Sequence, residues 1–466
     1  MTVLDTPADA PPRPYQSYVY AYPHKTAYGR LRPRPALRDL WAGEPKDSLA
    51  LYLHIPFCEV RCGFCNLFTR IGAPEGLVAG YLDALERQAA AVRDALGDGT
   101  APRFTAAAFG GGTPTFLEPA ELERLFDIAE HRMGADLRAV PLSVEASPAT
   151  ATADRLAVLA ARGTTRLSLG VQTFDAAEAR AAVRPKQQRS EVEAALGRIR
   201  EAGFPVLNID LIYGIDGQTE RSWRSSLDAA LAWRPEELYL YPLYVRPLTG
   251  LHRLDSTLTE AGWDEQRLRL YRAGRDLLLG SGYEQVSMRM FRRRGGPHPG
   301  ADAGPGTGAG AGAGADHACQ TDGMIGLGCG ARSYTAALHY SFDYAVGPGE
   351  VRAIIDDYVA RPAADFGHAD FGRAIGGGEA RRRHLLQSLL QAQGMPVADY
   401  TARFGRRPED DFGPELALFG ARGWLDAAAG PDLLRLSPEG LAHSDAVGPE
   451  LFSPAVRAAM AAYDAK

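Results

Sequence analysis

The sequence has few cysteines, no long apolar run and no excess of basic charge, and each shortage excludes a class of protein. Five cysteines in 466 residues are too few, and odd in number, for a disulfide framework. No run of 18 apolar residues occurs and the mean hydropathy is −0.21, so we expect no membrane-spanning helix. The formal net charge of −6 offers no basic field to nucleic acid or to an anionic membrane.

The first fourteen residues lack the features of a secretory signal. They are rich in Pro, Ala and Asp, with neither a basic start nor an apolar centre, so we expect no signal peptide and a cytoplasmic protein. Thiols that cluster in a reducing compartment are typical of metal ligands rather than of disulfides. Three of the five cysteines, Cys58, Cys62 and Cys65, fall within eight residues.

Short apolar runs alternate with amphipathic segments of helical length from residue 51 onward. We expect strands at residues 51–55, 106–110, 142–145, 166–171, 206–212 and 237–243, and helices at 77–96, 118–132, 154–162, 190–202 and 220–232. Because no hairpin signal separates the strands, the pattern predicts a parallel sheet of an α/β protein. Six strand–helix units favour an open, partial (β/α)6 barrel, with ligands at the carboxyl ends of the strands.

The length exceeds what one hydrophobic core usually serves, and three segments are predicted. Residues 1–48 form an aromatic arm, which packs on the main domain or contributes to the rim of its active site. Residues 49–375 form the barrel, with a flexible Gly/Ala-rich insertion at 295–315 that buries too little apolar surface to become ordered. Residues 324–328 resume the barrel as a strand. Residues 376–466 resemble a small α+β winged-helix domain, with helices at 379–391, 396–404 and 408–422 and a hairpin at 424–436.

The clustered cysteines have the spacing CxxxCxxC on a loop after the first expected strand. Three thiolates can bind three corners of a [4Fe–4S] cluster, which normally takes four cysteines. The fourth iron is then left open, as a catalytic metal centre requires. Zinc is the alternative, with His54 as the nearest candidate for a fourth ligand. Cys319 and Cys329 are interpreted as buried small residues.

This motif resembles the radical S-adenosylmethionine (SAM) superfamily. In that superfamily the open iron binds SAM, and an electron from the cluster cleaves SAM to a 5′-deoxyadenosyl radical. Further motifs resemble the oxygen-independent coproporphyrinogen III oxidase family over nearly the whole chain. They are HIPFC at 54–58, GGGTPT at 110–115, RLSLGVQ at 166–172 and DLIYG at 210–214.

The resemblance implies roles for individual residues. Cys58, Cys62 and Cys65 hold the [4Fe–4S] cluster. The first SAM contacts seven residues: Phe64, Gly111, Gly112, Thr113, Gln172, Arg184 and Asp210. Tyr52 and Glu145 match positions around SAM, including a second SAM molecule, and with Arg332 they are the candidate catalytic residues. Glycine lets the backbone approach a charged ligand, and Arg184 suits a carboxylate.

Two positions differ from the oxidases. Leu67 stands where they carry a further cysteine, and Arg332 stands where they carry an aliphatic residue, which changes recognition toward an anion or polar group. These differences count against porphyrinogen decarboxylation. The sequence also resembles a related group, the class C radical SAM methyltransferases. We therefore expect transfer of a methyl or methylene group to an sp² carbon of a natural-product intermediate, as C-methylation or cyclopropanation, with a second SAM as donor.

Two alternatives stay open. One is oxidative decarboxylation of the coproporphyrinogen III oxidase type. The other is a haem-binding chaperone of the same family, although residues 317–322 lack the Tyr-Trp pair of that group. The expected partners are a small-molecule substrate, a reductant such as flavodoxin or ferredoxin, and a partner methyltransferase that completes the reaction. We expect the protein itself to be a monomer.

Overall fold

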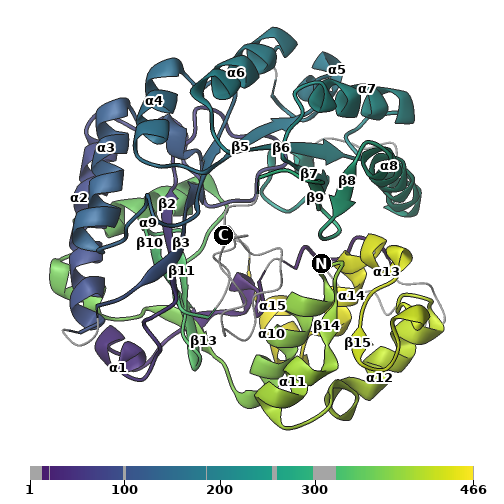
Figure 1. Cartoon of the computed structure of the whole chain (residues 1–466). Coiled ribbons are helices and arrows are strands. Elements are labelled where there is room, and N and C mark those ends of the chain that lie inside the picture. The colour runs from purple at the N-terminus through teal and green to yellow at the C-terminus, as the bar shows by residue number, and fades with distance from the viewer. Residues whose placement is uncertain are drawn as a thin grey trace.

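The fold is built on one large, open sheet, seen in a computed structural model that describes residues 13–19, 21–97, 101–184, 186–253, 260–297 and 322–464. Its nine strands run in the order β10-β2-β3-β4-β5-β6-β7-β9-β8. The strands are β2 (Leu49–Ile55), β3 (Phe104–Gly111), β4 (Leu142–Ala146), β5 (Arg166–Gln172), β6 (Val206–Tyr213), β7 (Glu237–Pro242), β8 (Tyr283–Gln285), β9 (Met290–Arg293) and β10 (Met324–Leu327). The sheet curves into an incomplete barrel (Figure 1), which confirms the predicted α/β fold.

Seven of these strands are parallel, and two are not. β10 pairs in parallel with β2, and each strand from β2 to β7 pairs in parallel with the next. At the other edge, β9 pairs antiparallel with both β7 and β8. The prediction of an entirely parallel sheet is wrong there, because strands of three and four residues are too short to show an alternating pattern.

Helices cover the outer face of the sheet (Figure 1). They are α2 (Leu77–Ala95), α3 (Pro119–Asp127), α4 (Ala153–Ala161), α5 (Ala176–Ala181), α6 (Arg189–Ala202), α7 (Glu220–Leu231) and α8 (Glu260–Gly280). A short π-helical turn, η3 (Ile128–Arg132), continues α3. The expected helix at 118–132 is therefore present as two consecutive helical segments.

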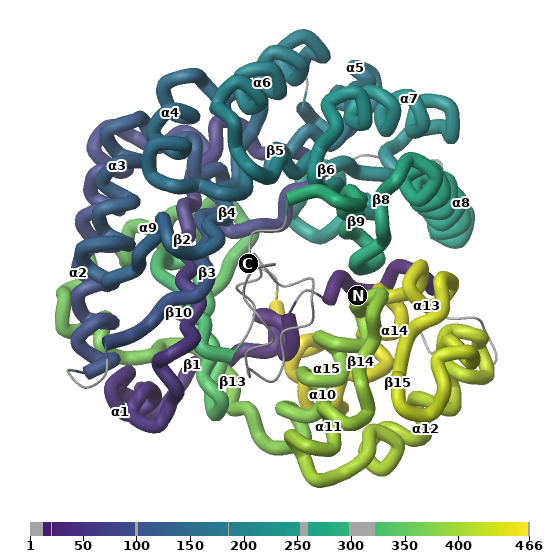
Figure 2. The backbone as a smooth tube through the Cα atoms, in the orientation of Figure 1, coloured from purple at the N-terminus to yellow at the C-terminus, as the bar shows by residue number. Residues whose placement is uncertain are grey.

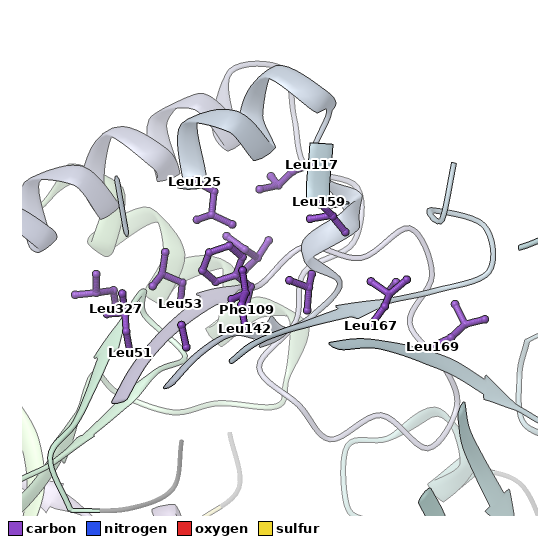
Figure 3. Packing of buried hydrophobic residues seen from close by; sticks show 14 of the residues in the cluster. Leu51, Leu53, Phe109, Leu117, Leu125, Leu142, Leu159, Leu167, Leu169 and Leu327 are labelled. Carbon is purple, nitrogen blue, oxygen red and sulfur yellow. The ribbon is translucent and has the colours of Figure 1, made fainter. Parts of the chain in front are cut away.

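The core lies between the sheet and these helices. Leu51 and Leu53 of β2 point outward and pack with leucines of the neighbouring strands and helices (Figure 3). Successive side chains of a strand alternate between faces, so Tyr52 and His54 point to the inner face. Burying each leucine stabilises the fold by roughly 1.5–3 kcal/mol, and this alternation fixes which residues of β2 can meet a ligand.

A smaller sheet and two helices flank the barrel. The sheet has the order β1-β13-β12-β11. Its strands are β1 (Gly29–Arg30), β11 (Arg332–Tyr334), β12 (Leu338–Ser341) and β13 (Phe371–Ala374), and the helices are α1 (Leu37–Trp41) and α9 (Pro348–Ala360). Most of the predicted insertion at 295–315 lies outside the described residues, as does Cys319.

The last ninety residues have a core of their own. Their helices are α10 (Gly377–Leu389), α11 (Val397–Phe404), α12 (Pro408–Ala421), α13 (Pro438–Ala442), α14 (Ser444–Glu450) and α15 (Pro454–Ala461). The expected hairpin at 424–436 is reduced to one bridge, Leu425 with Leu436. The short strand β15 (Leu433–Leu434) pairs with β14 (Met395–Pro396) instead, so this part is more helical than predicted.

The N-terminal arm runs between the barrel and the C-terminal helices (Figure 2). The Arg13 guanidinium pairs with Asp264 of α8 at 2.9 Å, and the Ser17 amide donates to the carbonyl of Asp445 in α14 at 3.2 Å. Tyr22 packs in the C-terminal core. The arm therefore touches both larger parts of the molecule. Among the described helices, none has the length and apolar character needed to span a membrane.

Candidate active site

The inner face of the sheet opens into a cavity of about 2440 Å³. The arm, the cysteine loop, the carboxyl ends of the strands and the helices α10 and α11 form its walls. Every residue that sequence reasoning selected lines this one cavity: Tyr52, Cys58, Cys62, Phe64, Cys65, Gly111, Gly112, Thr113, Glu145, Gln172, Arg184, Asp210 and Arg332. The fold thus brings together side chains that are up to 280 positions apart in sequence.

The three cysteines lie on a loop that leaves β2 and is closed by its own backbone. The Cys58 amide donates to the Arg70 carbonyl at 3.0 Å, and the Cys65 amide donates to the Cys62 carbonyl at 3.0 Å. All three thiols are partly buried. Burial raises the pKa of Cys58 to about 12 and also raises that of Cys65. Metal ligation requires thiolates, so cluster assembly on this loop must release protons.

The cysteine loop is held by two further loops that meet at Gly63. The Gly63 amide donates to the Ala182 carbonyl at 3.0 Å, and the Leu251 amide donates to the Gly63 carbonyl at 2.8 Å. A Cβ atom at Gly63 would lie 2.5 Å from Cγ2 of Val183. Only glycine therefore fits at this junction, and the segment after α5 and the loop after β7 set the position of the loop after β2.

The zinc alternative finds no support in the position of His54. Its Nε2 lies 3.2 Å from the Phe68 carbonyl, and its Nδ1 lies 3.1 Å from the Tyr52 hydroxyl. A carbonyl only accepts, so Nε2 carries the proton and Nδ1 accepts from Tyr52. Burial lowers the pKa of His54 to about 4, which keeps the ring neutral. In the described part of the chain, no three His, Cys, Asp or Glu side chains are grouped to hold a single metal ion. In a [4Fe–4S] cluster each cysteine binds a different iron.

The glycine-rich segment after β3 presses its backbone against β2. The Gly112 amide donates to the Ile55 carbonyl at 2.7 Å, and a Cβ atom there would lie 2.6 Å from the Phe57 carbonyl oxygen. Gly111 has a φ of +112°, and its Cβ would lie 2.3 Å from the His54 ring. These glycines leave a backbone cradle at the cavity wall that any side chain would fill.

Two carboxyl groups face the cavity from β4 and β6. Oε2 of Glu145 accepts from the Gly111 amide at 3.0 Å. Asp210 accepts from Asn208 at 2.7 Å and from the Ser168 hydroxyl at 3.2 Å. Glu145 is open to the cavity, but the surrounding protein desolvates it and Asp210 adds negative charge, which together raise its pKa to about 7. Burial likewise raises the pKa of Asp210.

The end of β5 is shaped by a bulge in its pairing with β6. The register shifts between Gly170 and Gln172, and Gln172 has a φ of +70°, uncommon for a residue other than glycine. Arg184 donates to the Gly170 carbonyl at 3.1 Å, which leaves the rest of its guanidinium to the cavity. Bulges of this kind re-aim side chains beside active sites.

Sequence reasoning missed several wall residues. His54 links Tyr52 to the loop at Phe68, and its position within HIPFC was the available signal. Lys25 of the arm lies 3.6 Å from the ring centroid of Tyr344. The Tyr344 hydroxyl in turn donates to the Asn66 carbonyl, next to Cys65, at 2.6 Å. Nothing in the spacing of Lys25 or Tyr344 indicates these contacts, which join segments more than 270 residues apart.

A parallel partial barrel with three cysteines after one strand and a glycine cradle after the next defines the class of protein. The family model described as the radical SAM superfamily matches residues 52–230, so this part of the chain is similar to a radical SAM domain. Radical SAM domains bind a [4Fe–4S] cluster and SAM. The cysteine spacing, the backbone cradle and the cavity fit both groups.

Within this class the chain resembles the oxygen-independent coproporphyrinogen III oxidases. It is 33% identical to that oxidase from Paracoccus denitrificans over 289 residues, which cover 60% of this chain and 61% of the relative. It is also 33% identical over 203 residues to the haem chaperone HemW of Bacillus subtilis, covering 44% of this chain and 52% of that protein. The matched regions thus span about three fifths or less of these relatives.

The likeness in fold extends further along the chain. The structure of coproporphyrinogen III oxidase from Escherichia coli, itself a radical SAM enzyme, superposes with a TM-score of 0.74. The superposition covers 92% of this chain and 96% of the oxidase, with 23% sequence identity. It shows that the barrel, the arm and the C-terminal helices together follow one known architecture.

Proposed function

We propose that the protein cleaves SAM reductively in the described cavity, and that its reaction is an oxidative decarboxylation of the coproporphyrinogen III oxidase type. The observation that carries this proposal is the meeting of the cysteine loop, the glycine cradle, Glu145 and Arg184 in one cavity. The likeness of sequence and fold to the oxidases supports the same reaction. This reverses the order of the sequence-based hypotheses, in which methyl or methylene transfer came first.

Each group of cavity residues has a separate role. Cys58, Cys62 and Cys65 would hold the cluster, which when bound supplies the electron that cleaves SAM to a 5′-deoxyadenosyl radical. Arg184 suits the SAM carboxylate, because a guanidinium forms charge-assisted hydrogen bonds with a carboxylate. The cradle at Gly111 and Gly112 admits a ligand close to the backbone.

Glu145 and Tyr52 are suited to orienting polar groups. Oε2 of Glu145 is already engaged by the Gly111 amide, so its second oxygen is available to accept from an ammonium or hydroxyl group. The Tyr52 hydroxyl donates to His54, which fixes its direction. A cavity of about 2440 Å³ exceeds the 300–1,000 Å³ typical of drug-sized ligands, so a second SAM or a large substrate can lie beside the first.

The first test is turnover by the anaerobically reconstituted protein. With reductant, SAM and coproporphyrinogen III, we expect 5′-deoxyadenosine and release of CO₂. Cys62→Ala should lose both products together with the full cluster. Cleavage of SAM without CO₂ release would contradict the decarboxylase assignment, and a Cys62→Ala protein that kept a full cluster and cleaved SAM would overturn the ligand set.

Transfer of a methyl or methylene group is the second candidate, favoured by two side chains in the cavity wall. Leu67 and Arg332 both line this cavity. Leu67 stands where the oxidases carry a further cysteine, and Arg332 stands where they carry an aliphatic residue. With methyl-deuterated SAM and an unsaturated acceptor that is turned over, this reaction places deuterium in 5′-deoxyadenosine. Its absence there excludes a methylene radical. Stoichiometric binding of haem without SAM turnover would support the chaperone instead.

A further inference from the structure

Three cationic side chains from three separate segments line the same cavity. Lys25 belongs to the N-terminal arm, Arg246 lies on the loop after β7, and Arg332 is the first residue of β11. Each is half-buried, so each side chain is partly enclosed by protein and partly open to the cavity. We call these three residues the cationic cluster.

His24 shows that the three charges act on one place. Its Nδ1 accepts from the Thr26 amide at 3.3 Å, which fixes the ring beside the arm backbone. Desolvation by the surrounding protein lowers the pKa of His24 well below its ordinary value, and the charges of Lys25, Arg332 and Arg246 lower it further. The positive charges therefore add at His24, and they favour a negative charge nearby.

Arg332 is held against the inner wall of β2. Gly326 of β10 pairs with Tyr52 of β2, and a Cβ atom at Gly326 would clash with the Arg332 carbonyl oxygen. After burial, the charges of Lys25 and Arg332 contribute to the lowered pKa of His54, whose Nδ1 accepts from the Tyr52 hydroxyl. The cationic cluster therefore lies beside the wall that Tyr52 and His54 form.

Aromatic rings restrain the two cations that come from loops. The ammonium group of Lys25 lies 3.6 Å from the ring centroid of Tyr344, and Cζ of Arg246 lies 4.5 Å from that of Tyr244. A ring face attracts a cation without neutralising its charge. These contacts therefore limit where the two side chains point and preserve the positive charge of the site.

The carboxyl groups of the cavity and Arg184 come from other elements than the cluster. Glu145 and Asp210 belong to β4 and β6, and Arg184 donates to the Gly170 carbonyl of β5 at 3.1 Å. The charges that shift the pKa of His24 do not include theirs. Because Arg184 suits the SAM carboxylate, the cationic cluster is a second positive site in the cavity, suited to a different anionic group.

We propose that the cationic cluster binds a carboxylate or phosphate group of the substrate, one that is not the reacting group. The proposal rests on the proposed function, because it requires a substrate beside SAM in this cavity. Two guanidinium groups match the paired oxygens of an oxyanion, and the Lys25 ammonium adds a compact charge. Arg332 and Lys25 are then specificity-determining residues, which select substrates that carry such a group.

The test measures binding without turnover. The full-length reconstituted enzyme, with SAM but no reductant, is titrated calorimetrically with tricarballylate, which carries three carboxylates, and with inorganic phosphate. We expect one of the two probes to bind, and Arg332→Met and Lys25→Met each to weaken it about tenfold. Arg332→Lys keeps the charge and should bind more tightly than Arg332→Met. Arg269→Met, which removes an exposed cation of α8, is the matched control.

The probe that binds more tightly identifies the group as carboxylate or phosphate. The proposal is wrong if the wild type binds neither probe, or if Arg332→Met and Lys25→Met bind them as the wild type does. Lys25→Met should retain its affinity for SAM. An equal loss of SAM and probe affinity would assign the charge to SAM and overturn the proposal. The proposed function fails separately, when the reduced wild-type enzyme releases no CO₂ from coproporphyrinogen III, whichever probe binds.

Discussion

Glu145 shows how one carboxyl group can respond to the whole cavity. Its backbone position at the end of β4 follows from the strand pattern, but its protonation depends on Asp210 from β6 and on the protein wall around it. The Gly111 amide opposes these effects by donating to Oε2. The result is a carboxyl group that titrates near neutrality before any ligand is present.

This titration predicts a pH dependence of stability. A raised pKa means that the folded protein holds the Glu145 proton more tightly than the unfolded chain, so stability falls as the pH rises from the ordinary carboxyl range through about 7. Glu145→Gln can keep the bond from Gly111 and removes the titration. We expect the unfolding free energy of cluster-free wild-type protein to decline relative to the variant between pH 5 and 8, measured by urea denaturation. Parallel pH profiles would contradict the raised pKa.

The cavity residues that lie within or next to a short sequence motif could be predicted from the sequence. The cavity residues that come from segments without such a motif could not. The cysteines, Gly111 and Glu145 each sit at the end of an expected strand, where parallel strands deliver their side chains to one edge. His54 is in the same string but was considered only as a zinc ligand. Lys25 and Tyr344 meet near the cysteine loop through tertiary packing alone, which no local pattern encodes.

At the scale of elements, the loop junction at Gly63 decides where the cysteines lie. The segment after α5 accepts a hydrogen bond from the Gly63 amide, and the loop after β7 donates one to the Gly63 carbonyl. Both therefore support a segment with no regular structure of its own. Val183 makes this support tight, since it occupies the space where a Gly63 side chain would lie.

The junction predicts a loss that a second substitution repairs. Gly63→Ala places Cβ within 2.5 Å of Val183 Cγ2, and overpacking of this kind costs about 1–3 kcal/mol. We therefore expect less iron and sulfide per chain after reconstitution. Val183→Gly in the same chain should restore most of the content, because both close atoms, Cγ2 at 2.5 Å and Cβ at 2.8 Å, belong to that side chain. Val183 has a φ of +56°, which glycine adopts readily. Gly43→Ala, whose Cβ has no neighbour within 4 Å and whose backbone is not left-handed, is the control. Failure of Val183→Gly to rescue would show that the cause lies elsewhere.

Element boundaries were predictable where burial is continuous. Strands β2 to β7 are apolar runs flanked by turn residues, and the expected and observed ranges agree within two residues at nearly every end. The hairpin of β8 and β9 and the small sheet of β11 to β13 are built from strands of three or four residues. Such strands are held by their partners rather than by their own pattern, so sequence reasoning passes over them.

At the scale of the whole molecule, a buried ion pair joins the barrel to the C-terminal helices. Arg289, just before β9, pairs with Asp445 of α14, and both side chains are almost fully buried. The Tyr244 hydroxyl donates to the same carboxylate at 2.5 Å. Tyr18 of the arm covers the guanidinium, with 3.8 Å between its ring centroid and Cζ. Four separate segments therefore meet at one pair of charges.

Breaking this pair should cost far more than a surface salt bridge. Asp445→Ala leaves the Arg289 charge buried without its carboxylate, and such changes destabilise proteins by about 3–5 kcal/mol. Arg289→Met combined with Asp445→Ala should be less destabilised than the sum of the single variants, as measured by urea denaturation in a double-mutant cycle. Arg269→Ala, which removes an exposed pair with Glu265, should change stability by less than about 1 kcal/mol. Strict additivity would mean that Arg289 and Asp445 act independently.

The N-terminal arm has a consequence for the order in which the molecule is completed. Arg13, Ser17 and Tyr22 are synthesised well before their partners Asp264, Asp445 and Ser453, the last of which follows Tyr22 by some 430 residues. Strands β2 to β7 can pair as they are made, because each pairs with the next strand in sequence. The arm can complete its contacts only after the C-terminal helices have been made. The arm therefore completes its wall of the cavity only after the barrel and the C-terminal helices are in place.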